Sequence, residues 1–293
     1  MTTNRGRVFL ALGALYFIWG STYLGIRVAL EGFPPLLMAG LRFVCAGALL
    51  YGAQRLRGEP NPTRKQWGAS ALVGLLLCGA NSFVCVAEQW VSSGVAAVAI
   101  ASVPLWAVLF AGLWGRWPAR RDWLALAVGL AGVLWLQAGG DLRASPAGAA
   151  VLLASTICWA LGSVWSRSLP LPKGLMASGA EMLSGGAVIL LVALLRGERL
   201  TAMPGARPLL AFAFLVVFGS LIAFSAYGFL LANVRPALAT SYAYVNPLVA
   251  VGLGALFAKE SIAPSALGAL ALILGGVGLL AFGRRETVGQ GSA

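Results

Sequence analysis

Long apolar runs separated by short polar breaks make up almost the whole sequence. A helix that crosses about 30 Å of hydrocarbon needs about 20 apolar residues, and the chain has ten runs of roughly that length. The runs are continuously apolar and lack the alternation of β-barrel strands, so helices are the expected spanning form. The sequence therefore predicts an all-α polytopic membrane protein with ten transmembrane helices. The ten runs cover residues 8–28, 35–54, 67–87, 95–115, 122–138, 147–166, 174–195, 208–231, 237–257 and 264–283.

The composition excludes most soluble functions. Charged residues make up 10% of the chain, against about 25% in an average soluble protein. There is no histidine, which removes Ser-His-Asp triads, HExxH metalloproteases and histidine metal sites. The phosphate-binding motif G-x-x-x-x-G-K-[ST] is also absent from the sequence. We therefore expect no enzyme activity, no metal site and no cofactor.

The basic residues suggest an orientation in the membrane. The 21 lysines and arginines outnumber the 9 acidic residues, which gives a net charge of +12. They lie in the short breaks and form no basic patch with interleaved aromatic residues, so a nucleic-acid partner is not expected. With the N-terminus in the cytoplasm, 14 of them lie inside, 6 lie outside and Arg42 lies within a span, and this excess inside agrees with the positive-inside rule. This predicts a multi-pass protein of the inner (plasma) membrane, with both termini cytoplasmic and membrane lipids against its basic loops.

The two halves of the chain resemble each other. Trp19 recurs 140 residues later as Trp159, and Pro104 recurs 143 residues later as Pro247. Further matches keep the same order and nearly the same offset. The pattern favours an internal duplication in which each copy supplies five of the ten spans.

The duplication defines the expected architecture. We assign residues 1–141 to a first five-helix repeat, and residues 142–293 to a second five-helix repeat with a short cytoplasmic tail. An odd number of spans per repeat forces the second copy to enter the membrane in the opposite direction. Inverted repeats are an architecture of secondary transporters, which bind substrate near the bilayer midplane between the halves. The expected fold is a 5+5 inverted-topology repeat around a central cavity.

Three segments carry a resemblance to a known family. They read WGSTYLGIRVALEGFPPLLMAGLRF (19–43), AEQWVSSGVAAVAIASVPL (87–105) and PALATSYAYVNPLVAV (236–251). They resemble the drug/metabolite transporter (DMT) superfamily, and within it the ten-helix EamA family, which includes inner-membrane exporters of aromatic and other amino acids. The resemblance implies a 5+5 bundle around a central cavity and export from the cytoplasm. Val103 stands where aromatic-amino-acid exporters carry an aromatic residue, which argues against a specificity for aromatic amino acids alone.

We therefore expect a secondary transporter that exports small metabolites, amino acids in the first place, by alternating access through the midplane cavity. An exporter of drugs or of other metabolites is the alternative within the same class. A channel-like membrane protein is the alternative from another class, although the spans show neither rings of charge nor a continuous polar lining. A monomer and a homodimer both agree with the sequence.

Two prolines are the candidate hinges. Pro104 and Pro247 lie near the middle of the fourth and ninth runs. A proline removes a backbone N–H and clashes with the carbonyl four residues earlier, and in lipid the freed polar groups need a cavity or another protein group. We interpret both prolines as hinges beside a cavity, with a kink that only shapes helix packing as the alternative.

Aromatic and polar side chains inside the spans are the candidate substrate contacts. An indole N–H deep in a membrane needs a partner, and polar side chains there point toward another helix or a cavity. Tyr242 and Asn246 are four residues apart and share a helix face. Packing and hydrogen bonds between helices are the alternative roles. The predicted substrate-binding residues are Trp19, Asn81, Phe83, Trp159, Ser163, Tyr227, Tyr242, Tyr244 and Asn246.

Three ionisable residues lie within or at the end of the spans. Arg42 and Glu181 fall inside the second and seventh runs, where charges are costly and usually pair or face water, so an ion pair between them is one interpretation. Glu88 closes the third run. If export is coupled to protons, Glu88 or Glu181 is the expected carrier, and facilitated export without coupling is the alternative.

Overall fold

The computed structural model describes residues 5–91, 96, 99–115, 117–137, 146–249 and 264–281. These ranges form helices, which confirms the predicted all-α class. The ten-span count and the inverted repeat stay predictions. Within these described ranges, six helices are long and apolar enough to cross a membrane: α1 (Arg5–Ala29), α2 (Pro35–Leu56), α3 (Arg64–Ala87), α7 (Pro146–Trp165), α8 (Leu175–Leu195) and a continuous helix (Ala206–Asn233). The other described helices are α5 (Val103–Leu113), α6 (Arg120–Gln137), α11 (Pro236–Ala239), α13 (Pro264–Ala281) and a helical stretch at 242–249.

Local sequence signals explain where several helices begin. α2 starts at Pro35, whose ring fixes a helical backbone angle and whose missing N–H costs nothing in a first turn. α3 begins with a capping box, in which the Thr63 side chain accepts from the Gln66 backbone N–H and the Gln66 side chain accepts from the Thr63 N–H. These starts agree with the predicted second and third spans.

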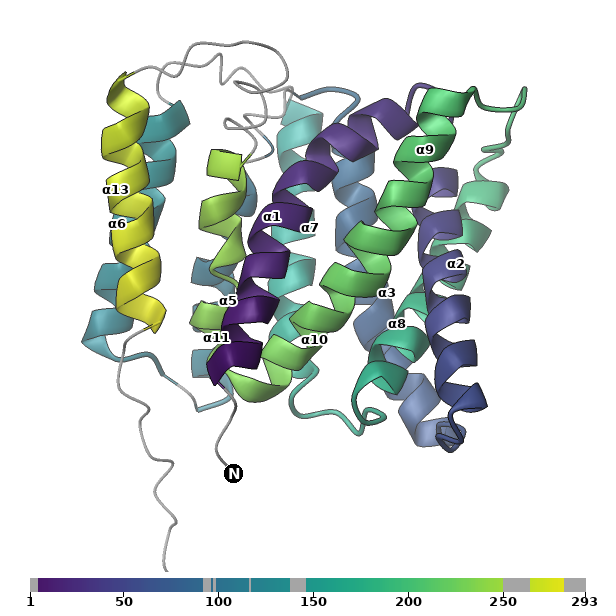
Figure 1. Ribbon diagram of the computed structural model, residues 1–293, viewed down its shortest axis with the longest axis horizontal. Helices are drawn as coiled ribbons and strands as arrows, with labels where there is room; N and C mark the ends of the chain where they lie inside the picture. Colours follow the sequence, from purple (N-terminus) through teal and green to yellow (C-terminus); the bar gives the residue numbers. More distant parts are fainter. Residues whose placement is uncertain are drawn as a thin grey trace, which may run out of the picture.

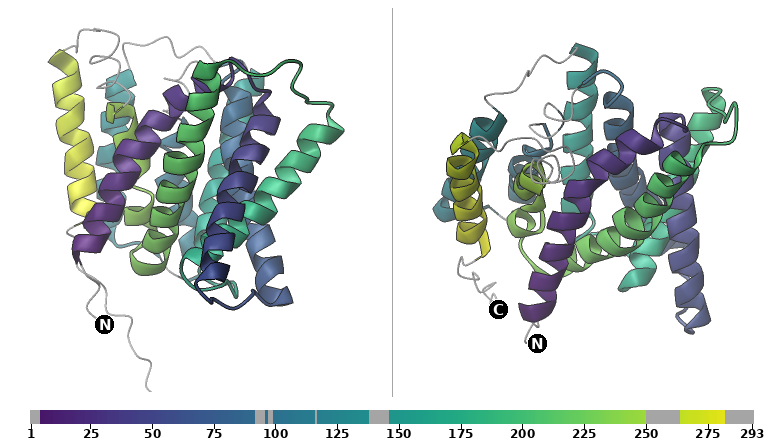
Figure 2. Two further views of the ribbon diagram at one scale, coloured as in Figure 1. Left: turned by 45° about the vertical axis from the view of Figure 1, so that its right-hand side comes forward. Right: turned by 45° about the horizontal axis from the view of Figure 1, so that its top comes forward.

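The helices form one bundle with a pair of helices at its edge. α1 begins and α13 ends at the same end of the bundle (Figures 1 and 2). α2 packs along α8, and α3 packs against both α8 and α7. α6 and α13 form the edge pair, which stands beside α5 and α11 in Figure 1.

Glycines allow the closest helix contacts. A Cβ on Gly74 of α3 would lie 2.1 Å from the backbone oxygen of Glu181 in α8, so only glycine fits this crossing. In the edge pair, a Cβ on Gly276 would lie 2.8 Å from the backbone nitrogen of Gly129. Small residues therefore pack α6 against α13, whereas a Cβ on the neighbouring Gly275 would meet open space.

The continuous helix Ala206–Asn233 is irregular in its middle. It consists of α9 (Ala206–Phe214), the π-helical segment η1 (Leu215–Ile222) and α10 (Ala223–Asn233). A π-helix has i→i+5 hydrogen bonds, is rare, and frequently lies at a functional site when it occurs within an α-helix. The segment packs against α1 and α2.

Turns interrupt the helical path in the regions of the predicted fourth and ninth spans. One turn at 101–102 precedes α5, and another at 240–241 separates α11 from the helical residues 242–249. Pro104 is the second residue of α5, where the first turn tolerates a missing N–H. Pro247 lies within the helical residues 242–249. The two prolines thus differ in their local position, and their role as hinges stays a prediction.

Candidate functional site

Four aromatic side chains meet in the middle of the bundle. Trp19 of α1 lies at the centre, with ring centroids 4.6 Å from Tyr242, 5.2 Å from Tyr227 and 5.3 Å from Trp159. Trp159 and Tyr227 are 5.4 Å apart. Such edge-to-face and tilted pairs add about 0.5–1.5 kcal/mol each beyond the area that they bury. We call these four residues the aromatic cluster.

Hydrogen bonds fix the orientation of both indole rings. Trp19 Nε1 donates to the backbone oxygen of Gly219 in η1, at 3.0 Å. Trp159 Nε1 donates to the Tyr227 hydroxyl at 3.1 Å, and that hydroxyl also pairs with the Ser163 hydroxyl at 2.5 Å. The expected partners of the two deep N–H groups are therefore present within the protein.

A central cavity of about 50 Å³ opens against the aromatic cluster. It has room for a few water molecules and is too small for an amino acid, so this conformation encloses no substrate-sized space at the cluster. Its walls come from α1, α3, α5, α7 and the helical residues 242–249. The polar and aromatic residues among its lining are Trp19, Thr22, Tyr23, Asn81, Ser155, Trp159, Tyr242 and Asn246.

Two asparagines present hydrogen-bonding groups to this cavity. The Oδ1 atom of Asn246 is buried and has no hydrogen-bond partner among the described residues. The Oδ1 atom of Asn81 accepts from Arg42 Nη1 at 3.2 Å, which leaves the amide nitrogen of Asn81 for another acceptor. The cavity thus combines a vacant acceptor with an available donor.

Arg42 is a buried cation with neutral partners. Its side chain is 1% exposed, and it donates to Asn81 and, at 2.7 Å, to the Ser220 hydroxyl of η1. No ion pair joins it to Glu181, although both residues are described and buried. The interpretation of an Arg42–Glu181 ion pair is therefore wrong for this conformation, in which Arg42 is hydrogen-bonded to Asn81 and Ser220 instead.

Four of the predicted substrate contacts do not line the central cavity. Ser163 and Tyr227 lie directly behind Trp159. Phe83 is 37% exposed, on a different face of α3 from Asn81. Tyr244 packs instead against α6, where its hydroxyl donates to the Leu126 backbone oxygen at 3.3 Å.

Helix geometry explains the last two placements. Residues two apart on an α-helix point about 200° away from each other. Tyr244 is two residues from Tyr242 and two from Asn246, so it cannot share their face. The same spacing separates Phe83 from Asn81. Substrate contact by Phe83 and Tyr244 stays untested, and neither residue reaches the cavity here.

The cavity also contains polar residues that the sequence reasoning missed. Tyr23 lies four residues after Trp19, and Ser155 lies four residues before Trp159, so each shares a face with its tryptophan. The Ser155 hydroxyl donates to the Ala80 backbone oxygen at 2.7 Å. A search four residues either side of each deep tryptophan would have found both residues.

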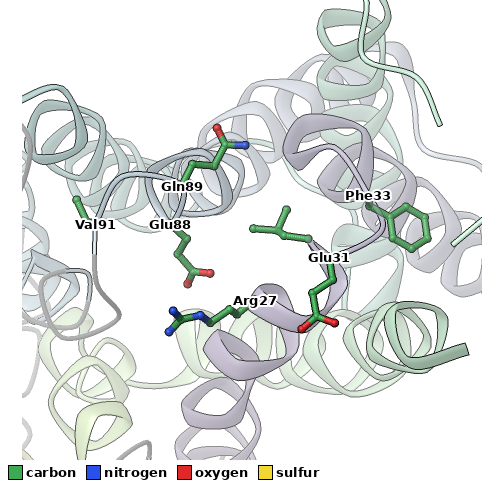
Figure 3. A pocket seen from close by; sticks show the side chains of 7 residues that line it. Arg27, Glu31, Phe33, Glu88, Gln89 and Val91 are labelled. Carbon is green, nitrogen blue, oxygen red and sulfur yellow. The ribbon is translucent and has the colours of Figure 1, made fainter. Parts of the chain in front are cut away.

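A second and larger pocket lies where α1 and α3 end. Figure 1 shows these helix ends at the opposite end of the bundle from the start of α1. We call it the distal pocket. Its volume is about 260 Å³, and Figure 3 shows the Glu88 carboxyl group and the Arg27 guanidinium group pointing toward each other across it. Glu31, at its rim, pairs with Arg207 at 3.4 Å. The lining residues are Arg27, Leu30, Glu31, Phe33, Glu88, Gln89 and Val91.

Within the described ranges, no group of three or more histidine, cysteine, aspartate or glutamate side chains could hold a metal ion. The groups that the two pockets offer to a ligand are aromatic rings and amides in the central cavity, and charged side chains in the distal pocket.

Comparison with known families matches residues 6–137 and 146–282 to the EamA-like transporter family. The inner membrane transporter YedA of Escherichia coli (strain K12) is 46% identical over 279 residues, which cover 94% of this chain and 91% of YedA. Protein PecM of Dickeya dadantii is 27% identical, over 85% of this chain and 84% of PecM. A crystal structure at 22% identity matches with a TM-score of 0.78, over 94% of this chain and 98% of that chain, and this likeness concerns the fold.

Proposed function

Because the chain belongs to the EamA-like transporter family of the DMT superfamily, it is a multi-pass inner-membrane transporter and not an enzyme, and we propose that it exports amino acids from the cytoplasm by alternating access. On this proposal the central cavity is the substrate site. The orientation with both termini in the cytoplasm is part of the proposal, since it decides which end of the bundle releases substrate.

The chemistry of the central cavity is the observation that carries the proposal. An amino acid presents an ammonium group with donors, a carboxylate with acceptors, and a side chain. The vacant Oδ1 of Asn246 suits the ammonium group, and the amide nitrogen of Asn81 suits the carboxylate. The rings of Trp19, Trp159 and Tyr242 offer an apolar wall to the side chain and can attract the ammonium charge.

Two observations support a duplicated architecture. The EamA-like family matches the chain twice, at 6–137 and 146–282, close to the proposed repeats 1–141 and 142–293. The helix contacts also occur in related pairs: α1 packs against the helix 206–233 as α3 packs against α7, while α2 meets α8 and α6 meets α13. A twofold relation between the halves would produce this set of pairs.

Alternating access requires the cavity to open. On this proposal the cavity of about 50 Å³ corresponds to a closed state, and substrate entry needs helices to move apart. The helical path is already interrupted at the turns 101–102 and 240–241, in the same spans as Pro104 and Pro247, so it can bend there without loss of helical hydrogen bonds elsewhere.

Apolar organic cations, such as many drugs, are the second candidate substrate class. The aromatic cluster alone favours them.

Transport by purified protein in liposomes tests the proposal. Uptake of each of the twenty labelled amino acids is measured against empty liposomes, with a labelled apolar cation as a separate arm. Flux of amino acids above the empty-liposome rate supports the proposal. Flux of the cation alone would replace it with drug export, and the absence of amino-acid flux would reject amino acids as substrates.

Replacing Asn246 with alanine is expected to weaken substrate binding by about 10- to 100-fold. A hydrogen bond to a charged group contributes about 1.5–3 kcal/mol, and about 1.4 kcal/mol corresponds to a factor of ten. The Michaelis constant for flux in liposomes measures the effect. The matched control is Asn233→Ala, at an exposed asparagine at the end of α10. Equal Michaelis constants for the wild type and Asn246→Ala would show that Asn246 does not bind the substrate.

A further inference from the structure

The distal pocket is five times larger than the central cavity, at about 260 Å³ against about 50 Å³. Its walls carry charges of both signs. Arg27 comes from the last turn of α1, and Glu88 is the first residue after α3. Both side chains face the same space in Figure 3.

The carboxyl group of Glu88 lacks a hydrogen-bonding partner in the described part of the chain. Both of its carboxyl oxygens are buried, and neither has a hydrogen-bond partner among the described residues. A buried carboxylate without a partner is costly, so the group takes up a proton or gains a cation. Burial accordingly raises the pKa of Glu88 to about 8, and the positive charge of Arg27 acts in the opposite direction.

Glu88 lines the distal pocket, whose volume of about 260 Å³ admits a ligand ammonium group. The titratable groups that interact electrostatically with Glu88 are Arg27 and Tyr23 from α1 and Cys85 from α3. Glu31, the other acidic residue of the pocket, is already paired with Arg207. Arg27 is exposed and lines the same pocket.

The helix faces that line the central cavity continue into the distal pocket. On α1, Trp19, Tyr23 and Arg27 follow one another at intervals of four residues, and therefore form one stripe about 12 Å long. On α3, Asn81 and Glu88 are seven residues apart, which is about two turns. Substrate leaving the central cavity along these faces would enter the distal pocket.

Tyr23 is the residue of this stripe that interacts with groups of both spaces. It lines the central cavity together with Asn246, and its hydroxyl interacts electrostatically with Glu88 of the distal pocket.

We propose that the distal pocket is a second binding site for the exported amino acid, in which Glu88 receives the ammonium group and Arg27 the carboxylate. The site takes an amino acid with an aliphatic side chain, because Leu30, Phe33 and Val91 form its apolar wall. This inference rests on the proposed function. A ligand with only a positive charge would lose the contact with Arg27, and one with only a negative charge would lose the contact with Glu88.

Counting bound leucine tests the second site. Equilibrium dialysis of the purified protein with labelled L-leucine is expected to find two molecules per chain. Glu88→Gln and Arg27→Gln should each remove one molecule, whereas Asn246→Ala should weaken only the other. The matched control, Glu59→Gln at an exposed glutamate, should retain both. Isoamylamine and 4-methylpentanoate, which each lack one charged group of leucine, should bind the distal pocket at least about tenfold more weakly, as expected when a charged partner is lost.

The pH gives a signature that a structural role for Glu88 would not produce. Glu88 binds an ammonium group only as a carboxylate, and with a pKa of about 8 the carboxylate fraction rises steeply between pH 6 and pH 8. The affinity of the second site for leucine should therefore increase up to about 50-fold over this range. In Glu88→Gln the remaining binding should lack this increase.

The outcomes separate this inference from the proposed function. Leucine flux in liposomes together with a single bound leucine, unaffected by Glu88→Gln, would overturn the second site and leave the export function standing. Equal binding of isoamylamine and leucine at the distal pocket would overturn the requirement for a zwitterion. If no amino acid gives flux or binding, the function and the second site fall together.

Discussion

Replacing Gly74 with alanine is expected to lower the free energy of unfolding by at least about 1–3 kcal/mol. The added Cβ would lie 2.1 Å from the backbone oxygen of Glu181, and a backbone atom cannot rotate away as a side chain can. α3 and α8 would have to move apart along their contact. That movement would also separate Gly185 from the backbone of Gly74, a contact so close that a Cβ added to Gly185 would lie 2.4 Å from it.

Thermal unfolding of the purified protein in detergent measures this effect. The matched control is Gly79→Ala in the same helix, where an added Cβ meets nothing within 4 Å. That variant should be neutral, or more stable by up to about 1 kcal/mol, because alanine is the better helix former. Equal unfolding temperatures for the two variants would contradict the close crossing of α3 and α8.

Replacing Trp159 with alanine is expected to lower amino-acid flux at least about 30-fold. Truncating a tryptophan at the centre of a binding site costs about 2 kcal/mol or more of binding free energy, and about 1.4 kcal/mol corresponds to a factor of ten. The substitution changes the central cavity directly, because Trp159 lines this cavity and its ring contacts those of Trp19 and Tyr227. The Tyr227 hydroxyl would also lose the hydrogen bond from Nε1.

Initial rates in liposomes, normalised to the amount of folded protein, measure the change. Trp159→Phe keeps a ring and removes the N–H, so it should fall between the wild type and the alanine variant. Trp123→Ala provides the control, because the Trp123 side chain is 38% exposed on α6. Wild-type rates for Trp159→Ala would show that the aromatic cluster only packs the helices.

The sequence predicted the helical class and the faces of several helices from two simple rules. The length of apolar runs located the spans, and the proline at the start of α2 matched its boundary. The interval of four residues placed Tyr242 and Asn246 on one face, and both line the central cavity. These features are local, so they can be read without knowing the partners of each helix.

Features that depend on distant partners were harder to predict. The sequence indicated that the charge of Arg42 needs a partner. Glu181, the acidic residue considered for this role, does not pair with Arg42. Asn81 and Ser220 take that place, because α2 packs against α3, which carries Asn81, and against η1, which carries Ser220. Aromatic residues suit both a cavity and a helix interface, so residue type alone could not separate Tyr242 from Tyr244.

The length of the π-helical segment Leu215–Ile222 determines the directions in which the side chains of α10 point. Each π turn takes up one more residue than an α turn. Deleting one residue there would turn Phe224 and Tyr227 by about 100° relative to α1, and Tyr227 would lose its place beside Trp19. The directions of these side chains relative to α1 therefore depend more on the number of residues in the segment than on which apolar residues they are.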